Sequence, residues 1–161
     1  MNLRVPRGSI FALLGPAAAG KSTLLKLILG LQHPSAGGGL CLGFDILTRG
    51  LQIREKAGYL GQEPCFYGYM TAAGLLHFCR GFYRHWENSL AGSLLDRLKI
   101  PERVPINRFT REQRRCLGLV VALAPRPDLL LLDEPTAGFD PVERRLFFSI
   151  IEEEVAARKM T

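Results

Sequence analysis

The sequence lacks any apolar run long enough to cross a membrane. A transmembrane helix needs about 18 or more consecutive apolar residues, and residues 129–132 (LLLL) show how short the strongly apolar stretches are here. The start, MNLRVPRGSIFALLG, is unlike a signal peptide, because its apolar stretch is short and is followed by a glycine-lysine loop. We therefore expect a cytoplasmic protein without membrane spans.

The sequence also lacks cysteine pairs at metal-binding or redox spacing, and it has only one short cluster of basic residues. The four cysteines, at positions 41, 65, 79 and 116, have no CxxC spacing, so they favour buried thiols over a zinc site or redox pair. The net charge is +6, yet the basic residues are scattered except at Arg111, Arg114 and Arg115. This pattern favours a solvated surface over a nucleic-acid interface. With 161 residues and 47% apolar residues, the chain suits one folded domain.

Strand-like and helical patterns alternate along the chain. Short apolar runs beside glycines predict strands, whereas apolar residues at helical spacing predict helices. Strands are expected at 9–14, 40–44, 58–60 and 129–132, and helices at 21–31, within 71–99, at 110–124 and from Asp140-Pro141 onward. In the last helix the residues expected to face inward are Val142, Leu146, Phe147, Ile150, Ile151 and Val155. Alternation of this kind predicts an α/β fold.

Residues 15–23 fit the phosphate-binding pattern G-x-x-x-x-G-K-[ST] between a predicted strand and a predicted helix. Backbone N–H groups of such a loop point at phosphate oxygens, a lysine adds a positive charge at the β- and γ-phosphates, and a serine hydroxyl ligates Mg²⁺. Lys21 and Ser22 have these positions. The predicted nucleotide-binding residues are Gly15, Pro16, Ala17, Ala18, Ala19, Gly20, Lys21, Ser22 and Thr23.

A second motif, LLLLDE (129–134), places two carboxylates at the end of a predicted buried strand. In parallel sheets such a strand end lies beside the phosphate loop. Asp133 is therefore predicted to hold Mg²⁺ and Glu134 to polarise the attacking water. A solvated acidic turn is the alternative for this motif taken alone.

Together with YLGQEP (59–64), FTREQRR (109–115) and LLLLDEPTAGFDP (129–141), the loop resembles the nucleotide-binding domain of ABC transporter ATPases over nearly the whole chain. Residues 82–101 also resemble bacterial ABC-2-type exporter ATPases. The resemblance implies a P-loop NTPase-like parallel sheet flanked by helices, with an inserted helical subdomain and a short N-terminal antiparallel β region. It implies one domain, residues 1–161, with a RecA-like core (1–65 and 125–161) and a helical subdomain (about 66–124).

The resemblance also implies roles at matching positions. Gln62 would be the Q-loop glutamine, which contacts Mg²⁺ and senses the membrane partner, and Asp140 would belong to the D-loop at a dimer interface. The catalytic residues would be Glu134, Lys21 and Gln62, and the metal ligands Ser22, Gln62 and Asp133. ATP and Mg²⁺ are the implied ligands. The helical subdomain would face a transmembrane permease.

The segment FTREQRR aligns with the family's signature, which contacts ATP held by the opposite subunit. Its residues are Thr110, Arg111, Glu112 and Gln113, and Thr110-x-x-Gln113 is also a helix capping box. Arg111 and Glu112 replace two glycines that let backbone N–H groups approach phosphate. A carboxylate there is expected to repel the γ-phosphate, whereas Arg111 partly compensates. The segment is thus both a helix start and a weakened half of a site.

Other departures concern the phosphate loop and the two ends. Ala17 and Ala18 replace the usual asparagine and glycine, and an alanine at position 18 is costly only where φ is positive. The histidines, at 33, 77 and 85, all precede Asp133, so the family's switch histidine is missing, and Phe11 is the sole aromatic ahead of the loop. We therefore expect either a fragment cut at both ends or a reduced family member.

These observations predict the ATP-hydrolysing, energy-coupling subunit of an ABC transporter, with a second ATPase subunit and a permease as partners on the inner face of the cell membrane. A degenerate ATP-binding module that pairs with a competent subunit is the alternative. A DNA-repair or chromosome ATPase has only the basic pI near 9.5 in its favour, and no coiled-coil heptads support it. No nucleic-acid partner is expected.

Overall fold

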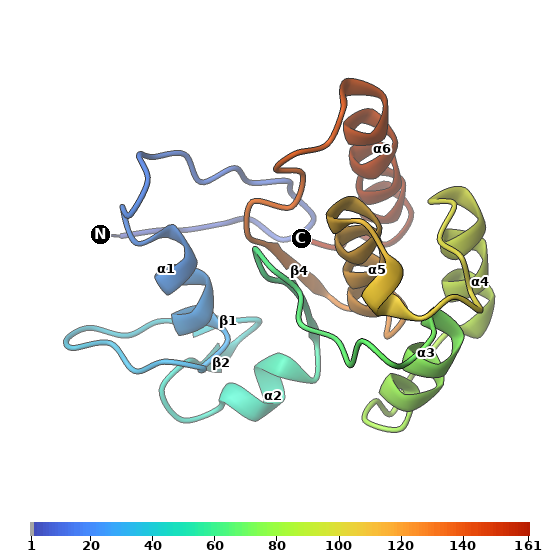
Figure 1. The fold of residues 1–161 in the computed structure, drawn as a ribbon. Coiled ribbons are helices and arrows are strands. Elements are labelled where there is room, and N and C mark those ends of the chain that lie inside the picture. Colours follow the sequence, from blue (N-terminus) through green and yellow to red (C-terminus); the bar gives the residue numbers. More distant parts are fainter. Residues whose placement is uncertain (1) are drawn as a thin grey trace.

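The computed structural model describes residues 2–161 as helices on a small parallel sheet (Figure 1). The elements in chain order are α1 (Lys21–Ile28), β1 (Leu40–Cys41), β2 (Phe44–Asp45), α2 (Gly50–Arg54), β3 (Ala57–Leu60), α3 (Ala72–Arg80), α4 (Asn88–Arg97), the 3₁₀ helix η1 (Ile106–Arg108), α5 (Arg111–Leu123), β4 (Leu129–Leu132) and α6 (Pro141–Arg158). The parallel pair β3–β4 and the antiparallel pair β1–β2 confirm the predicted fold class. Within residues 2–161 no helix is both long and apolar enough for a bilayer.

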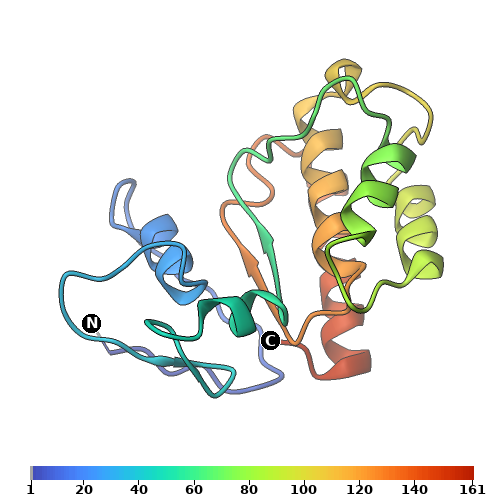
Figure 2. The same cartoon turned by 90° about the horizontal axis from the view of Figure 1, so that it is seen from below.

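Strands β3 and β4 run parallel and in register, from Ala57 opposite Leu129 to Leu60 opposite Leu132. Their carboxyl ends therefore meet at one edge of the sheet, and the residues that follow Leu60 and Leu132 become neighbours. Helices α3, α4, α5 and α6 lie on one side of this pair, whereas α1, α2 and the β1–β2 hairpin lie on the other (Figure 2).

A single hydrophobic core joins the sheet to the helices of the predicted helical subdomain. Leu60 of β3, Leu94 of α4, Leu117 of α5 and Phe147 of α6 are each at most 1% exposed. On the opposite side of the sheet, α1 contributes no buried residue. The core thus fixes the β3–β4 edge firmly on its helix-covered side.

Two glycines let α5 lie unusually close to β3. A Cβ atom on Gly58 would come within 2.4 Å of the Ala122 carbonyl oxygen, and one on Gly118 within 2.5 Å of the buried Leu60 Cδ1. Real Cβ contacts are not that short. At Gly58 the clash would be with backbone, which moves only with the helix, whereas at Gly118 it would be with the end of the Leu60 side chain, so Gly58 requires glycine more strictly. The helix axis is consequently held against the strand at two points.

The predicted strand at 9–14 is absent, because in the described structure these residues pair with no neighbouring strand. On the β4 edge away from β3, Thr161 N donates to Asp128 O (3.0 Å) and Leu130 N donates to Thr161 O (2.7 Å). Gly8 N in turn donates to the Thr161 hydroxyl (2.8 Å), so the N-terminal segment lies outside Thr161. Without ladder partners this segment stays irregular, and Leu14 is 89% exposed.

Other elements differ from the predictions at their ends. Helix α1 ends at Ile28, before Gly30 with its φ of +63°. The predicted strand at 40–44 is a hairpin, whose two-residue turn Leu42-Gly43 has positive φ angles that match strand twist.

The predicted inner face of α6 is largely confirmed: Phe147, Ile150 and Ile151 are buried, and Leu146 and Val155 are partly buried. Val142 is the exception, because it is 74% exposed in the first turn. Among the cysteines Cys116 is buried and Cys41 and Cys79 are half-buried, but Cys65 is exposed, contrary to expectation.

The close approach of α5 to β3 can be tested by adding one methyl group at Gly58, as an alanine side chain. We expect Gly58→Ala to lower the free energy of unfolding by about 1–3 kcal/mol, because its Cβ meets a backbone oxygen that moves only with the helix. Gly92→Ala in α4 is the matched control, since a Cβ there meets nothing within 4 Å, and helix propensity favours alanine by up to about 1 kcal/mol. Urea unfolding measures both, and equal stabilities would contradict the packing.

Candidate functional site

Residues 15–20 form an exposed turn in front of α1. Gly20 is the N-cap, with a φ of +85° and no side-chain acceptor, so the first N–H groups of α1 remain open to an anion. Lys21 Nζ donates to the carbonyl oxygens of Gly15 (2.9 Å) and Pro16 (2.8 Å). The Lys21 ammonium group, which is predicted to contact the phosphates, is therefore hydrogen-bonded to the backbone of its own loop.

Ala18 has a φ of +60°, in the left-handed region that glycine tolerates best. An alanine at this position is expected to be costly where φ is positive, and the structure has a positive φ here. Ala17 does not share this conformation. Because Ala18 stands where the family usually has glycine, its left-handed φ adds strain of about 1 kcal/mol to the phosphate loop.

Asp133 stands at the carboxyl end of β4 and is only 5% exposed. Its N–H donates to Leu60 O (2.9 Å), which extends the β3–β4 ladder by one residue. Among residues 2–161 no hydrogen bond reaches its carboxylate. Burial, and then the charge of Asp133, raise the pKa of Tyr59 on the facing strand. The ladder thus fixes the backbone of Asp133, and its carboxylate oxygens, which accept no described hydrogen bond, can ligate a cation.

Gln62 and Glu134 come from the two neighbouring strand ends and meet directly. Gln62 Nε2 donates to Glu134 Oε2 at 2.8 Å. Glu134 is exposed and has a φ of +48°, a conformation that non-glycine residues adopt mainly where their surroundings demand it. The bond leaves the amide oxygen of Gln62 free to accept or to ligate.

The signature segment begins α5 with the predicted capping box. Gln113 N donates to Thr110 Oγ1 (3.1 Å), and Thr110 N donates to Gln113 Oε1 (3.0 Å). Arg111 is exposed at the first helical position. The helix start is thereby confirmed, whereas the role of these residues toward a nucleotide of another subunit stays a prediction.

Glu112 faces the D-loop of its own chain. A Cβ atom on Gly138 would lie 3.6 Å from Glu112 Oε1 and 3.9 Å from Arg115 Nη1. The pKa of Glu112 is lowered by its own backbone N–H, then by the Thr110 hydroxyl and by the charges of Arg115 and Arg111. The carboxylate is therefore ionised and partly engaged at the helix start.

The D-loop is anchored at its far end. Phe139 is buried and meets Phe147 edge-on, with ring centroids 5.5 Å apart. Asp140 Oδ1 accepts from Val142 N and Glu143 N, both at 2.8 Å, which caps α6 as predicted. Asp140 is thus held at the start of α6, and its predicted place at a dimer interface stays a prediction.

The structure assembles one half of the predicted site and leaves the other apart. Gln62, Asp133 and Glu134 share the β3–β4 edge, and the signature helix borders them. Among residues 2–161 no hydrogen bond joins the loop 15–23 to any of these three residues. Residues 9–14, which lead into the loop, form no strand in the described structure.

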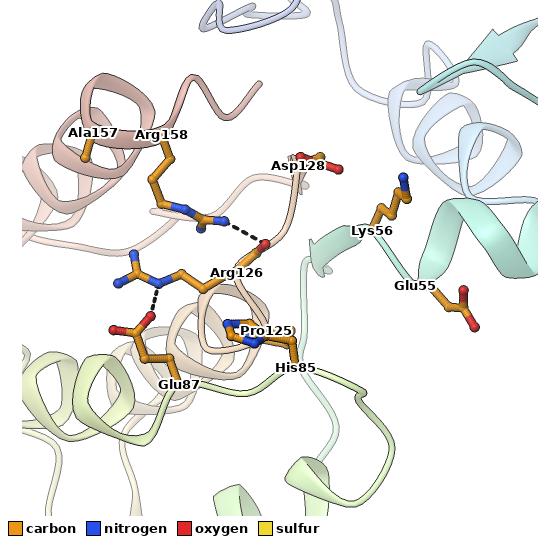
Figure 3. A pocket seen from close by; sticks show the side chains of 9 residues that line it. All are labelled: Glu55, Lys56, His85, Glu87, Pro125, Arg126, Asp128, Ala157 and Arg158. Carbon is orange, nitrogen blue, oxygen red and sulfur yellow. Dashed lines mark hydrogen bonds and ion pairs between the residues drawn. The ribbon is translucent and has the colours of Figure 1, made fainter.

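A separate hollow of about 670 Å³ opens at the opposite end of the sheet (Figure 3). It is lined by Lys56 and Asp128, which precede β3 and β4, and by the Arg126 network. Arg126 binds Glu87, whose pKa this hydrogen bond lowers to about 2, and Glu154 at 2.8 Å. Because it lies where β3 and β4 begin, at the opposite end of the sheet from Gln62 and Asp133, this hollow is separate from the predicted nucleotide site.

The residues present fit Mg²⁺ and a nucleotide triphosphate. Ser22, Gln62 and Asp133 offer oxygen atoms, which Mg²⁺ prefers, and the carboxylate of Asp133 is buried without a described donor. The uncapped start of α1 supplies N–H groups for phosphate.

Sequence reasoning missed two residues of this region. Arg115 donates from Nε (3.3 Å) and Nη2 (3.2 Å) to the backbone oxygen of Gln62, and Phe139 anchors the D-loop from inside the core. Arg115 stood in the sole basic cluster of the chain, but nothing in that cluster indicated a backbone acceptor 53 residues away.

The parallel sheet, the glycine-lysine loop before a helix and the acidic strand end define the class of P-loop nucleotide-binding proteins. Within it, the family model described as ABC transporter matches residues 1–137, and the chain belongs to this family of transporter ATP-binding proteins.

Individual comparisons agree. The chain is 35% identical over 98% of its length to an uncharacterized ABC transporter ATP-binding protein of Nostoc sp.. It is also 35% identical over its whole length to the probable multidrug ABC transporter ATP-binding protein YbhF of Escherichia coli. A bacterial ABC transporter cassette solved as a dimer shares the fold, with a TM-score of 0.87 and 22% identity over 99% of this chain and 75% of that one. The chain spans 49% of the Nostoc relative and 29% of the Escherichia coli relative.

The strain at Ala18 makes a prediction for stability, because the left-handed φ belongs to the folded loop itself. Ala18→Gly should leave the protein about 1 kcal/mol more stable than Ala17→Gly, since both variants loosen the unfolded chain but only the first relieves left-handed strain. Urea unfolding compares the two variants, and equal free energies of unfolding would contradict the strain.

Proposed function

We propose that the chain is the ATP-binding and ATP-hydrolysing part of an ABC transporter subunit, which drives a permease. The observation that carries this proposal is the 2.8 Å hydrogen bond between Gln62 and Glu134, beside the buried Asp133. It brings a proton-accepting carboxylate, an amide and a buried metal-binding carboxylate to one sheet edge. Such a trio suits activation of water for attack on a phosphoryl group.

Each residue has a task in this proposal. Lys21 leaves the Gly15 and Pro16 carbonyls and contacts the β- and γ-phosphates, while the first N–H groups of α1 bind phosphate oxygens. Ser22, Gln62 and Asp133 hold Mg²⁺, which when bound neutralises developing phosphate charge. Glu134 accepts a proton from the attacking water, and Gln62 orients that carboxylate.

The proposed partners follow from family membership. A second ATPase subunit, identical or related, would complete the site with its signature residues Thr110–Gln113 and its Asp140 region. The domain would divide into the RecA-like core and the helical subdomain expected above. A transmembrane permease would contact the helical subdomain, so the protein would lie on the inner face of the cell membrane.

Loss of the phosphate-loop lysine tests the binding step. We expect Lys21→Ala to weaken Mg-ATP binding at least about tenfold, because the only lysine of the loop supplies the charge at the phosphates. Lys26→Ala, on the same helix, is the control and should bind like the parent. Titration calorimetry of the purified protein measures both. Equal affinities for both variants would refute the proposed phosphate loop.

The alternative is a degenerate module that binds ATP without hydrolysing it, and the strained Ala18 and the carboxylate of Glu112 favour it. Glu134→Gln separates the two functions. If Glu134 accepts the proton, this variant should bind ATP normally yet release phosphate at least about a hundredfold more slowly. Glu152→Gln, an exposed residue of α6, is the control. A parent protein that binds ATP but releases phosphate no faster than Glu134→Gln establishes the alternative.

A further inference from the structure

Helix α5 runs antiparallel to β3 with a regular series of contacts. Ala122 lies against Gly58, and one turn earlier Gly118 lies against Leu60. Pro64 also touches the Gly118 position, at 3.5 Å from a Cβ built there. The next residue on this side of the helix is Arg115, and the next position along the strand direction is Gln62. Close packing at the two glycines thus brings the side chain of Arg115 beside Gln62 of the Q-loop.

The contact at this point is made to the backbone, not to a carboxylate. Two nitrogens of the Arg115 guanidinium, Nε and Nη2, donate to Gln62 O at 3.3 and 3.2 Å. Among residues 2–161 no ion pair includes Arg115, although acidic side chains are near. The third nitrogen, Nη1, lies 3.9 Å from the Cβ position of Gly138 in the D-loop.

The neighbouring arginine shows what an ordinary structural role looks like here. Arg114 donates to the Ile106 and Asn107 carbonyl oxygens, eight and seven residues earlier, and so ties α5 to the turn before it. Arg115 instead binds the backbone of Gln62, 53 residues earlier, and the side chain of Gln62 donates to Glu134. A solvated surface arginine would not be half-buried with two donors on one carbonyl oxygen.

We propose that Arg115 is a positioning residue for ATP hydrolysis, which clamps the backbone of Gln62 so that its side-chain amide meets Glu134. This inference rests on the proposed hydrolysis. The clamp also joins the signature helix to the Q-loop within one subunit. A displacement of the α5 start therefore moves Gln62 relative to Glu134.

The test compares Arg115→Met, which keeps the apolar stem but no donor, with Arg115→Lys and with Arg108→Met. Arg108 is an exposed arginine just ahead of α5, and no described hydrogen bond involves its side chain. In the full protein with its partner subunits, we expect Arg115→Met to lower kcat about tenfold with KM for ATP within twofold, because Arg115 touches the Q-loop and not the nucleotide. Arg115→Lys should recover part of the loss, and Arg108→Met should match the parent.

A double-mutant cycle separates positioning from general stability. If Arg115 acts through Gln62, Arg115→Met should have no further effect on kcat in a Gln62→Ala background, whereas an unrelated structural loss would add fully. Full additivity, or a kcat for Arg115→Met equal to that of Arg108→Met, overturns the proposal.

Hydrogen exchange tests the clamp independently of turnover. Amides in residues 59–66 should exchange faster in Arg115→Met than in the parent or in Arg108→Met, because the Q-loop loses its attachment to α5. If the parent binds ATP without hydrolysing it, the proposed function fails while this readout still decides the clamp. Unchanged exchange in residues 59–66 of Arg115→Met overturns the inference.

Discussion

The close approach of α5 to β3 is the constraint on which the rest of this structure depends. Gly58 and Gly118 remove the two side chains that would separate helix and strand. The helix then seals one face of the sheet, and Leu60 and Leu117 become fully buried. Cores at such density transmit displacement instead of absorbing it. The same closeness brings the start of α5 against the loops that leave both strands.

The parallel register of β3 and β4 converts that packing into a site. Because the strands are paired from Ala57–Leu129 to Leu60–Leu132, the chain leaves the sheet at one edge with Gln62 on one loop and Asp133 and Glu134 on the other. Asp133 extends the ladder by one hydrogen bond and is buried, whereas Glu134, with its positive φ, turns outward. Adjacent carboxylates thereby acquire different surroundings, one suited to a metal ion and the other to water.

Local patterns in the sequence were sufficient for most of this arrangement. The capping boxes at Thr110 and Asp140 depend on neighbours within three residues, and both are confirmed. The apolar run 129–132 is also a strand as predicted, although its ladder partners lie in β3. What failed depends on distant partners: residues 9–14 have the composition of a strand, but no strand of the described structure pairs with them. The contact of Arg115 was not predicted for the same reason, since its acceptor, the backbone oxygen of Gln62, is brought near only by the packing of α5 on β3.

The two halves of the nucleotide site consequently differ in how they are held. Gln62, Asp133 and Glu134 rest on a buried core, whereas the loop 15–20 is exposed and its lysine bonds to its own carbonyl oxygens. A nucleotide that contacts both halves therefore has to supply the free energy that draws the loop to the sheet and frees Lys21. Binding and assembly of the site are then one event. In the proposed function, the triphosphate would contact Lys21 and the α1 N–H groups at one end and the Asp133–Glu134 edge at the other.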